Sequence, residues 1–170
     1  MKRRKWFDRA FVLELPTEQL PETIERLRGT ATRLEERLRA IAPAVRVRRS
    51  GEAWSIQEHA GHLLDLESLW RTRLEQMLGG AETIEPADLT NRRTFEAGHN
   101  ERDLEAILAD FRRVRGEFVA RLEGLEDARL GARALHPRLR QPMNVTGLAY
   151  FVAEHDDHHL ARVTEELGRR

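Results

Sequence analysis

Apolar residues recur at alternating steps of three and four positions in four stretches of this 170-residue chain. That spacing places them on one face of an α-helix, so each stretch is typical of an amphipathic helix that packs against a core. We predict helices over residues 21–42, 56–78 and 101–124, and a fourth that starts within residues 143–146 and ends near residue 167. In the first stretch the apolar face comprises Leu20, Ile24, Leu27, Ala31, Leu34, Leu38 and Ile41.

Residues at the ends of these stretches support the predicted limits. Ser55 is followed three residues later by Glu58, which is the spacing of a capping box at the start of a helix. Two glycines directly after residue 78 suit the end of the same helix. Pro21 suits the first turn of the first helix, and we expect Pro43 to end it.

The connections between the predicted helices differ in length. Residues 81–100 form the longest stretch without clear periodicity and have room for a short helix over residues 88–97. Glycine and proline residues between positions 129 and 142 indicate a loop before the last helix. Four long amphipathic helices with one long middle crossover predict an all-α four-helix bundle, a single domain over residues 1–170.

Composition narrows the classes of protein that fit. The 29 basic and 29 acidic residues balance, so there is no electrostatic reason to expect a nucleic-acid partner, and we expect none. The absence of cysteine excludes disulfides, cysteine-based zinc sites and a protein thiol nucleophile. No apolar run is long enough to cross a membrane, and no apolar segment follows the basic residues within 1–5 as it would in a signal peptide. We therefore expect a cytoplasmic protein without a membrane partner.

The segment that contains His155 and His159 is the strongest candidate for chemistry. The two histidines lie one helical turn apart, so both imidazoles can reach one metal ion. They share a helix face with apolar residues, and burial there would leave their nitrogens unsatisfied unless a partner such as a metal ion binds them. The same spacing also arises by chance in solvated or hydrogen-bonded pairs. A metal site needs a third ligand, for which His62 and His59 are the candidates.

Two motifs extend this pattern to a known family. The patterns Trp54-Ser55-x-x-Glu58-x-x-x-His62-Leu63 and His155-x-x-x-His159-Leu160 together resemble the DinB/YfiT-like superfamily. The segments Lys5-Trp6-Phe7-Asp8-Arg9 and Ala153-Glu154-His155-Asp156-Asp157-His158-His159 are similar to its DinB_2 branch. The resemblance covers nearly the whole chain.

The resemblance implies a four-helix bundle, often a homodimer, whose metal triad corresponds to His62, His155 and His159. Members of the superfamily include S-transferases that use bacillithiol or mycothiol, a mycothiol-dependent maleylpyruvate isomerase, and proteins described as metal-dependent hydrolases. The implied cofactor is a divalent metal ion, and zinc or nickel suits three imidazoles. The implied function is S-transfer or hydrolysis on a small molecule, with a low-molecular-weight thiol as a candidate partner. The alternative is a non-catalytic metal-binding bundle or a stress-response dimeric scaffold.

The other histidines receive different predictions. The apolar stripe makes His59 the more buried candidate, whereas the family motif selects His62 as the ligand. His59 then becomes a core histidine or a hydrogen-bonding partner of a ligand. His158 lies off the inward face and is expected at the surface or the rim, and His99 and His136 fall in predicted loops, where we expect no functional role.

Charged residues near the motifs complete the candidate site. A nearby acidic side chain could accept a hydrogen bond from the ring nitrogen of a ligating histidine that does not bind the metal. For Asp156 and Asp157, however, a solvated surface charge is the better explanation. Arg138 and Arg140 could bind an anionic substrate near the pocket mouth, but chance explains them better in so arginine-rich a chain. The acidic candidates are Glu58, Glu154, Asp156 and Asp157.

Overall fold

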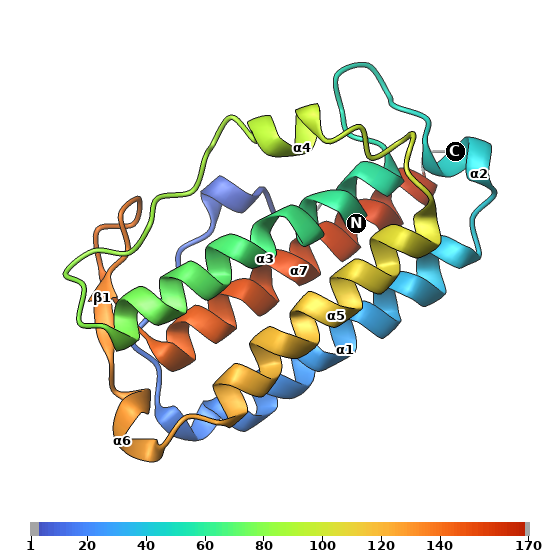
Figure 1. Ribbon diagram of the computed structural model, residues 1–170. Helices are drawn as coiled ribbons and strands as arrows, with labels where there is room; N and C mark the ends of the chain where they lie inside the picture. Colours follow the sequence, from blue (N-terminus) through green and yellow to red (C-terminus); the bar gives the residue numbers. More distant parts are fainter. Residues whose placement is uncertain (1–3, 169–170) are drawn as a thin grey trace.

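The computed structural model describes residues 4–168; residues 1–3 of the basic start and residues 169–170 lie outside the described part. Its main body is a bundle of four long helices, each within a few residues of the range that the apolar spacing predicts (Figure 1). The predicted all-α four-helix bundle is therefore confirmed. None of the helices within residues 4–168 is both long and apolar enough to span a membrane. The four are α1 (Leu20–Arg39), α3 (Ile56–Leu78), α5 (Leu104–Glu123) and α7 (Val145–Gly168).

The direction of the helices explains the long crossover. Helices α1 and α7 run one way, and α3 and α5 run the other way (Figure 1). Helix α1 packs against α5 and α7, and α3 packs against the same two helices. Because α3 and α5 are consecutive long helices that run in the same direction, the chain must return along the bundle between them. Residues 79–103 make that return and contain the short helix α4 (Arg92–Glu96), as predicted.

Local sequence explains where α3 starts. The Ser55 hydroxyl accepts a hydrogen bond from the Glu58 backbone N–H (3.1 Å), and the Glu58 carboxylate accepts one from the Ser55 N–H (2.8 Å). The predicted capping box is thus present. The prediction for Pro43 is wrong, since α1 already ends at Arg39 and Pro43 instead begins α2 (Pro43–Arg46). A missing N–H costs nothing in a first helical turn, which is why proline suits that place.

The apolar core consists of two clusters, one toward each end of the bundle. On every long helix, a buried polar residue falls between the residues of one cluster and those of the other. The bundle therefore contains a polar layer across its middle, to which each long helix contributes one side chain. These four residues are Thr30, Glu67, Arg115 and Asp156.

Arg115 connects this layer. Its guanidinium donates to the Glu67 carboxylate (2.6 Å from Nη2 to Oε1) and to both oxygens of Asp156, which also accepts from Thr30 Oγ1 (2.9 Å). Burial lowers the pKa of Arg115, but the two carboxylates outweigh it and raise that pKa above its ordinary value. The prediction that Asp156 is a solvated surface charge is wrong, because Asp156 is fully buried and paired. Its neighbour Asp157 is partly exposed.

The stretch before α7 is more ordered than the predicted loop. It contains α6 (Asp127–Leu130) and a hairpin in which β1 (Arg133–Leu135) pairs antiparallel with β2 (Pro142–Asn144). Arg140 has a φ of 54° in the turn, where its N–H donates to the His136 carbonyl (2.9 Å). Strands of three residues are too short for alternation to show in the sequence, so only the turn residues gave a signal.

The N-terminal segment is fastened to the start of α7. Asn144 binds it three times: the Asn144 N–H donates to the Leu13 carbonyl (3.1 Å), and the Asn144 side chain pairs with the N–H and carbonyl of Leu15. A Cβ atom at Gly147 would lie 1.8 Å from the Leu13 carbonyl oxygen, so only glycine allows this approach. The attachment places the short 3-10 turn Trp6–Asp8 beside α7, at the edge of the site.

Candidate metal centre

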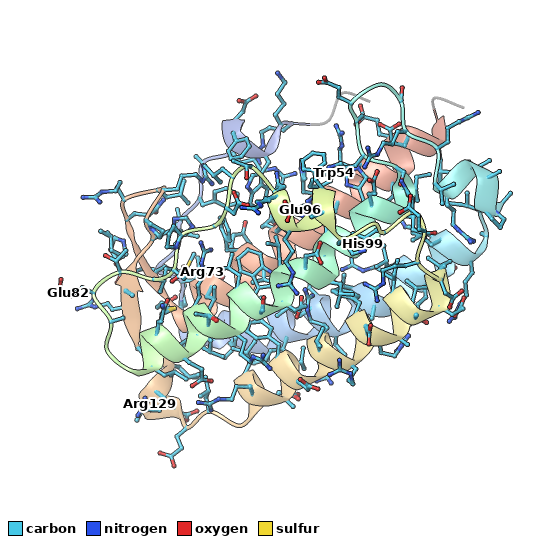
Figure 2. The ribbon with its side chains drawn as sticks, turned by 45° about the horizontal axis from the view of Figure 1, so that its top comes forward. Trp54, Arg73, Glu82, Glu96, His99 and Arg129 are labelled. Carbon is cyan, nitrogen blue, oxygen red and sulfur yellow. The ribbon has the colours of Figure 1, made fainter. Side chains whose placement is uncertain are left out.

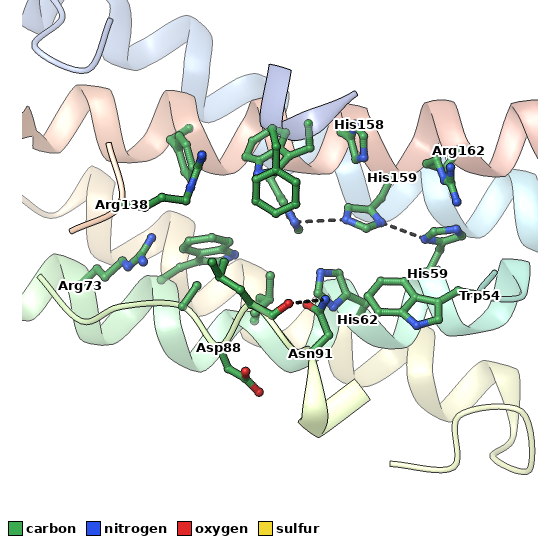
Figure 3. Close-up of a pocket in the computed structure, with 18 residues that line it drawn as sticks. Trp54, His59, His62, Arg73, Asp88, Asn91, Arg138, His158, His159 and Arg162 are labelled. Carbon is green, nitrogen blue, oxygen red and sulfur yellow. Dashed lines mark hydrogen bonds between the residues drawn. The ribbon is translucent and has the colours of Figure 1, made fainter. Parts of the chain in front are cut away.

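A pocket of about 240 Å³ lies between α3 and α7, with the N-terminal segment, the crossover and the hairpin around it (Figure 3). Its lining is rich in aromatic, histidine and arginine side chains. This combination gives an apolar wall with many nitrogen donors and few carboxylates. The aromatic residues are Trp6, Phe7, Trp54, Trp70 and Phe151, the histidines are His59, His62, His155, His158 and His159, and the arginines are Arg73, Arg138 and Arg162.

Three of these histidines converge on one point. Helix α3 supplies His62, and α7 supplies His155 and His159 one turn apart. One ring nitrogen from each lies within 4.8 Å of the others, and the Nε2 atoms of His155 and His159 are 3.1 Å apart. All three side chains are buried. The structure therefore brings together the three residues that the family motif selects.

Burial keeps this triad of His62, His155 and His159 uncharged at neutral pH. It lowers the pKa of His62 to about 4. It also lowers the pKa values of His155 and His159 well below the ordinary value, and neighbouring imidazoles act in the same direction. A neutral imidazole has a free lone pair on one nitrogen, which is the form that binds a metal ion.

A hydrogen-bonded chain from the crossover fixes the tautomer of His62. The Thr94 hydroxyl donates its hydrogen to Asp65 Oδ2 (2.9 Å), so towards His62 Nδ1 (3.0 Å) it can only accept. The proton of His62 is therefore on Nδ1, and Nε2 has a free lone pair. His99, beside α3 in Figure 2, bonds the same Asp65 oxygen through Nε2 (2.8 Å) and holds that carboxylate in place. Carboxylate-supported histidines of this kind are common around protein-bound metals.

His59 supports the triad from the other side. Its Nδ1 lies 2.9 Å from Nδ1 of His159, so one of these two atoms carries the proton of the hydrogen bond. If His159 uses Nε2 as a ligand, its Nδ1–H donates to His59, and the proton of His59 is then on Nε2. That Nε2 atom is buried and has no hydrogen-bond partner. Burial lowers the pKa of His59 to about 3, with Arg162 and nearby histidines acting in the same direction.

Aromatic packing orients His155. The indole rings of Trp6 and Trp70 meet its imidazole edge-on, with centroid distances of 5.2 and 5.7 Å. Its Nδ1 is buried without a partner, which leaves the ring dependent on packing and on whatever binds Nε2.

The residues present fit a divalent metal ion. Three neutral, buried imidazoles with converging nitrogens are costly to keep unless something satisfies them, and a cation does so. An all-imidazole set suits zinc or nickel and does not suit magnesium or calcium, which prefer oxygen ligands.

None of the four predicted acidic partners hydrogen-bonds a triad histidine. Glu58 belongs to the capping box and binds Arg49, and Asp156 lies in the polar layer. Glu154 and Asp157 form ion pairs with arginines of the N-terminal segment and α1. The supporting acid is instead Asp65, three residues after His62. That helical spacing was a usable signal, whereas nothing in the sequence marks Thr94.

Three further histidines are buried, and the two arginines of the hairpin turn differ in position. Of the two positions expected for His158, the open surface is wrong, because His158 is buried against Trp6 and His159 and lines the pocket. His99 and His136, expected in loops, are both buried. Arg138 lines the pocket, as the anion-binding hypothesis requires, but Arg140 is exposed on the hairpin turn outside it.

Comparison with known proteins places this chain in a family. The chain belongs to the DinB superfamily, whose family model matches residues 26–163. YfiT from Bacillus subtilis, described as a probable metal-dependent hydrolase with an unusual four-helix bundle topology, has a TM-score of 0.80 at 20% identity, with 95% of this chain and 93% of YfiT covered. The colibactin self-resistance protein ClbS, solved in complex with dsDNA, has a TM-score of 0.67 at 15% identity, with 85% and 93% covered. No curated protein matches the sequence significantly.

The exclusion of a nucleic-acid partner from net charge is wrong. ClbS has a similar fold and is seen in complex with dsDNA, so the fold does not rule out such a partner. Net charge is a sum over the whole chain and does not describe how charge is distributed locally. In this protein three arginines line a single pocket although the total charge is zero.

Proposed function

We propose that His62, His155 and His159 hold a divalent metal ion, and that the pocket around them is the active site of a metal-dependent transferase for low-molecular-weight thiols. The observation that supports this proposal is that three buried imidazole nitrogens lie within 4.8 Å of one another. The likeness to YfiT, described as a probable metal-dependent hydrolase, supports the metal without identifying the reaction.

Zinc or nickel held by three neutral imidazoles would act as a Lewis acid that lowers the pKa of a bound water or thiol. The protein's own contribution is orientation. Thr94 and Asp65 hold His62 with its Nε2 lone pair free, and His59 holds His159. The tryptophan and phenylalanine side chains of the wall exclude water and accommodate an apolar body.

Thiol transfer is favoured over hydrolysis because the carboxylates near the triad are already engaged in other hydrogen bonds. Hydrolysis generally uses a base beside the attacking water. Asp65 is engaged by Thr94 and His99, and the carboxylate among the described lining residues, Asp88, caps the turn at Thr90. A thiol supplied by a co-substrate needs no such base once it is deprotonated, and the lack of cysteine in the chain is no obstacle.

Hydrolysis is the second candidate because of one feature of His59. Its Nε2, which carries the ring proton in the tautomer described above, is buried without a partner in a pocket-lining residue, so His59 could donate a hydrogen bond to a substrate oxygen there. A small ester or amide would then be the substrate.

A paired assay separates these reactions. Zinc-loaded and nickel-loaded protein would be given 1-chloro-2,4-dinitrobenzene with bacillithiol, mycothiol or glutathione, and separately 4-nitrophenyl acetate without thiol. We expect metal-dependent thiol consumption that disappears in His155→Ala and after chelation. Ester hydrolysis with the same dependence would instead support the second candidate. Neither activity, in protein that binds metal, would contradict an enzymatic role and favour the non-catalytic bundle.

A further inference from the structure

One end of the pocket carries two arginines that form no ion pair with the residues of the described range 4–168. Arg73 of α3 is 1% exposed and lines the pocket. Its Nε donates to the Glu85 carbonyl (2.8 Å) and its guanidinium lies over Trp70. Neither of its terminal nitrogens bonds a residue within the described range. Burial lowers the pKa of Arg73 to about 10, with Arg138 acting in the same direction and Glu85 opposing it.

Arg138, from the β1–β2 turn, faces the same end. Figure 3 shows Arg73 and Arg138 together, at the opposite end of the pocket from Trp54 and His59. The Arg138 guanidinium lies over the Phe7 ring, and its Nη2 is buried without an acceptor. Among residues 4–168, no carboxylate forms an ion pair with either arginine.

His136 is a neighbour of the two arginines, although it does not itself line the pocket. Its Nδ1 accepts the Leu139 N–H (3.2 Å), so its proton is on Nε2, which is buried and unpartnered. Its ring packs against Phe151 of the pocket wall. Burial, followed by Arg73 and Arg138, lowers the pKa of His136 to about 4, so this imidazole stays neutral beside the two arginines.

The contrast with Arg115 shows what is missing. Arg115 and Arg73 are buried to nearly the same degree, yet Arg115 is paired with two carboxylates and Arg73 with none. An unpaired buried cation is costly, so a fold that retains one beside a second arginine implies a partner from outside the chain. Planar guanidinium groups bind carboxylates through paired hydrogen bonds.

We propose that Arg73 and Arg138 form a subsite that binds the carboxylate of a small organic acid whose apolar body lies along the aromatic wall. This inference rests on the proposed function in that the same pocket is the substrate site. Arg73 follows His62 by eleven residues on α3, which corresponds to roughly 16 Å along the helix at 1.5 Å per residue. The acid would therefore be anchored at one end of the pocket, with its other end toward the triad.

The test compares an acid with its uncharged analogue. Binding of 3-phenylpropionate and 3-phenylpropionamide would be measured by isothermal titration calorimetry, with zinc-loaded and with chelated protein. We expect the acid to bind at least about tenfold more tightly than the amide in both forms, the effect of one or two charged hydrogen bonds. Arg138→Gln should weaken binding of the acid more than binding of the amide and so reduce this preference.

Matched variants make the result specific. Arg140→Gln changes an exposed arginine of the same turn and should keep the full preference. Arg73→Lys retains a charge but removes the planar fork, and should weaken acid binding several-fold. Circular dichroism checks that each variant is folded. Equal affinities for acid and amide, or the same behaviour of Arg138→Gln and Arg140→Gln, would overturn the proposal.

The titrations with chelated protein separate this proposal from the proposal that the triad binds a metal ion. A preference for the acid that persists without metal, in a protein whose triad binds no zinc or nickel, would support the carboxylate subsite while the proposed function fails. A preference that disappears on chelation would mean that the acid binds the metal ion, which overturns the subsite and leaves the metal proposal standing.

Discussion

The Nδ1 atom of His62 lies 3.0 Å from the hydroxyl oxygen of Thr94, a residue of the crossover that joins α3 to α5. Because Thr94 gives its hydrogen to Asp65, this contact determines which nitrogen of His62 is free. A connection between two helices thus takes part in the site, and its removal should be measurable.

Thr94→Val should weaken metal binding without unfolding the bundle. The valine has a similar shape but leaves His62 Nδ1 without an acceptor, and loss of such a partner usually costs about 10- to 100-fold in metal affinity. Competition titration with a zinc indicator measures the change. Thr23→Val is the control, because Thr23 is also buried but its hydroxyl bonds the carbonyl of Gln19, directly before α1 and far from the triad. Equal affinities in the two variants would show that Thr94 has no role at the site.

Gly61 is predicted to be intolerant of a side chain. A Cβ atom there would lie 2.2 Å from Cγ of His99, so alanine must displace the histidine that holds Asp65. We expect Gly61→Ala to lower the free energy of unfolding by roughly 1–3 kcal/mol. Gly116→Ala, in a helix with open space around the glycine, should instead be neutral or stabilise by up to about 1 kcal/mol. Urea denaturation of both variants checks this, and similar effects would contradict the close packing of His99.

The polar layer should be sensitive to loss of its cation. Arg115→Met leaves Glu67 and Asp156 buried without their partner, and breaking a buried pair in this way costs roughly 3–5 kcal/mol. Arg113→Met on the exposed face of the same helix should change stability by no more than about 0.5 kcal/mol. If the two variants unfold at the same denaturant concentration, the layer does not stabilise the bundle.

Acid should weaken the contact between α1 and α5. The hydrogen bond from Arg112 holds the pKa of Glu35 below its ordinary value of 4.5, against an opposing effect of burial. A folded-state pKa below the unfolded-state pKa gives stability that is present above about pH 4.5 and lost as the pH falls through the folded-state pKa. The contribution of such a half-exposed pair is about 1 kcal/mol or less.

Denaturation curves between pH 5 and pH 3 test this contribution. Arg112→Gln should show a smaller fall in stability over that range than the wild type, whereas Arg113→Gln, next to it, should keep the wild-type fall. An unchanged fall in Arg112→Gln would show that the pair does not respond to pH in this way.

Much of the bundle could be predicted because the signals are local. The apolar steps of three and four gave the four long helices, and Ser55 with Glu58 gave the start of α3. The spacing of His155 and His159 placed two imidazoles together, and the family motif supplied His62 where the apolar stripe alone favoured His59. In the structure His62 belongs to the histidine triad, and His59 is hydrogen-bonded to His159.

The remaining features depend on contacts between distant parts of the chain. Pattern analysis assumes one buried face per helix, but α7 packs against α1 and α3 and is also covered by Trp6, so Asp156 and His158 are buried as well. Thr94 lies in a crossover with no periodicity. Its position follows from the path of the crossover along α3, which no local pattern encodes.

The metal content of purified, tag-free protein, measured by elemental mass spectrometry, decides whether the triad is a metal centre. We expect close to one zinc or nickel ion per chain in the wild type, loss of that ion in His62→Ala, His155→Ala and His159→Ala, and circular dichroism that still shows a folded bundle. His158→Ala, which removes a neighbouring histidine outside the cluster, should keep its metal. If the wild type binds neither ion after incubation with it, or if His59→Ala loses the ion while His62→Ala keeps it, the proposed triad is wrong.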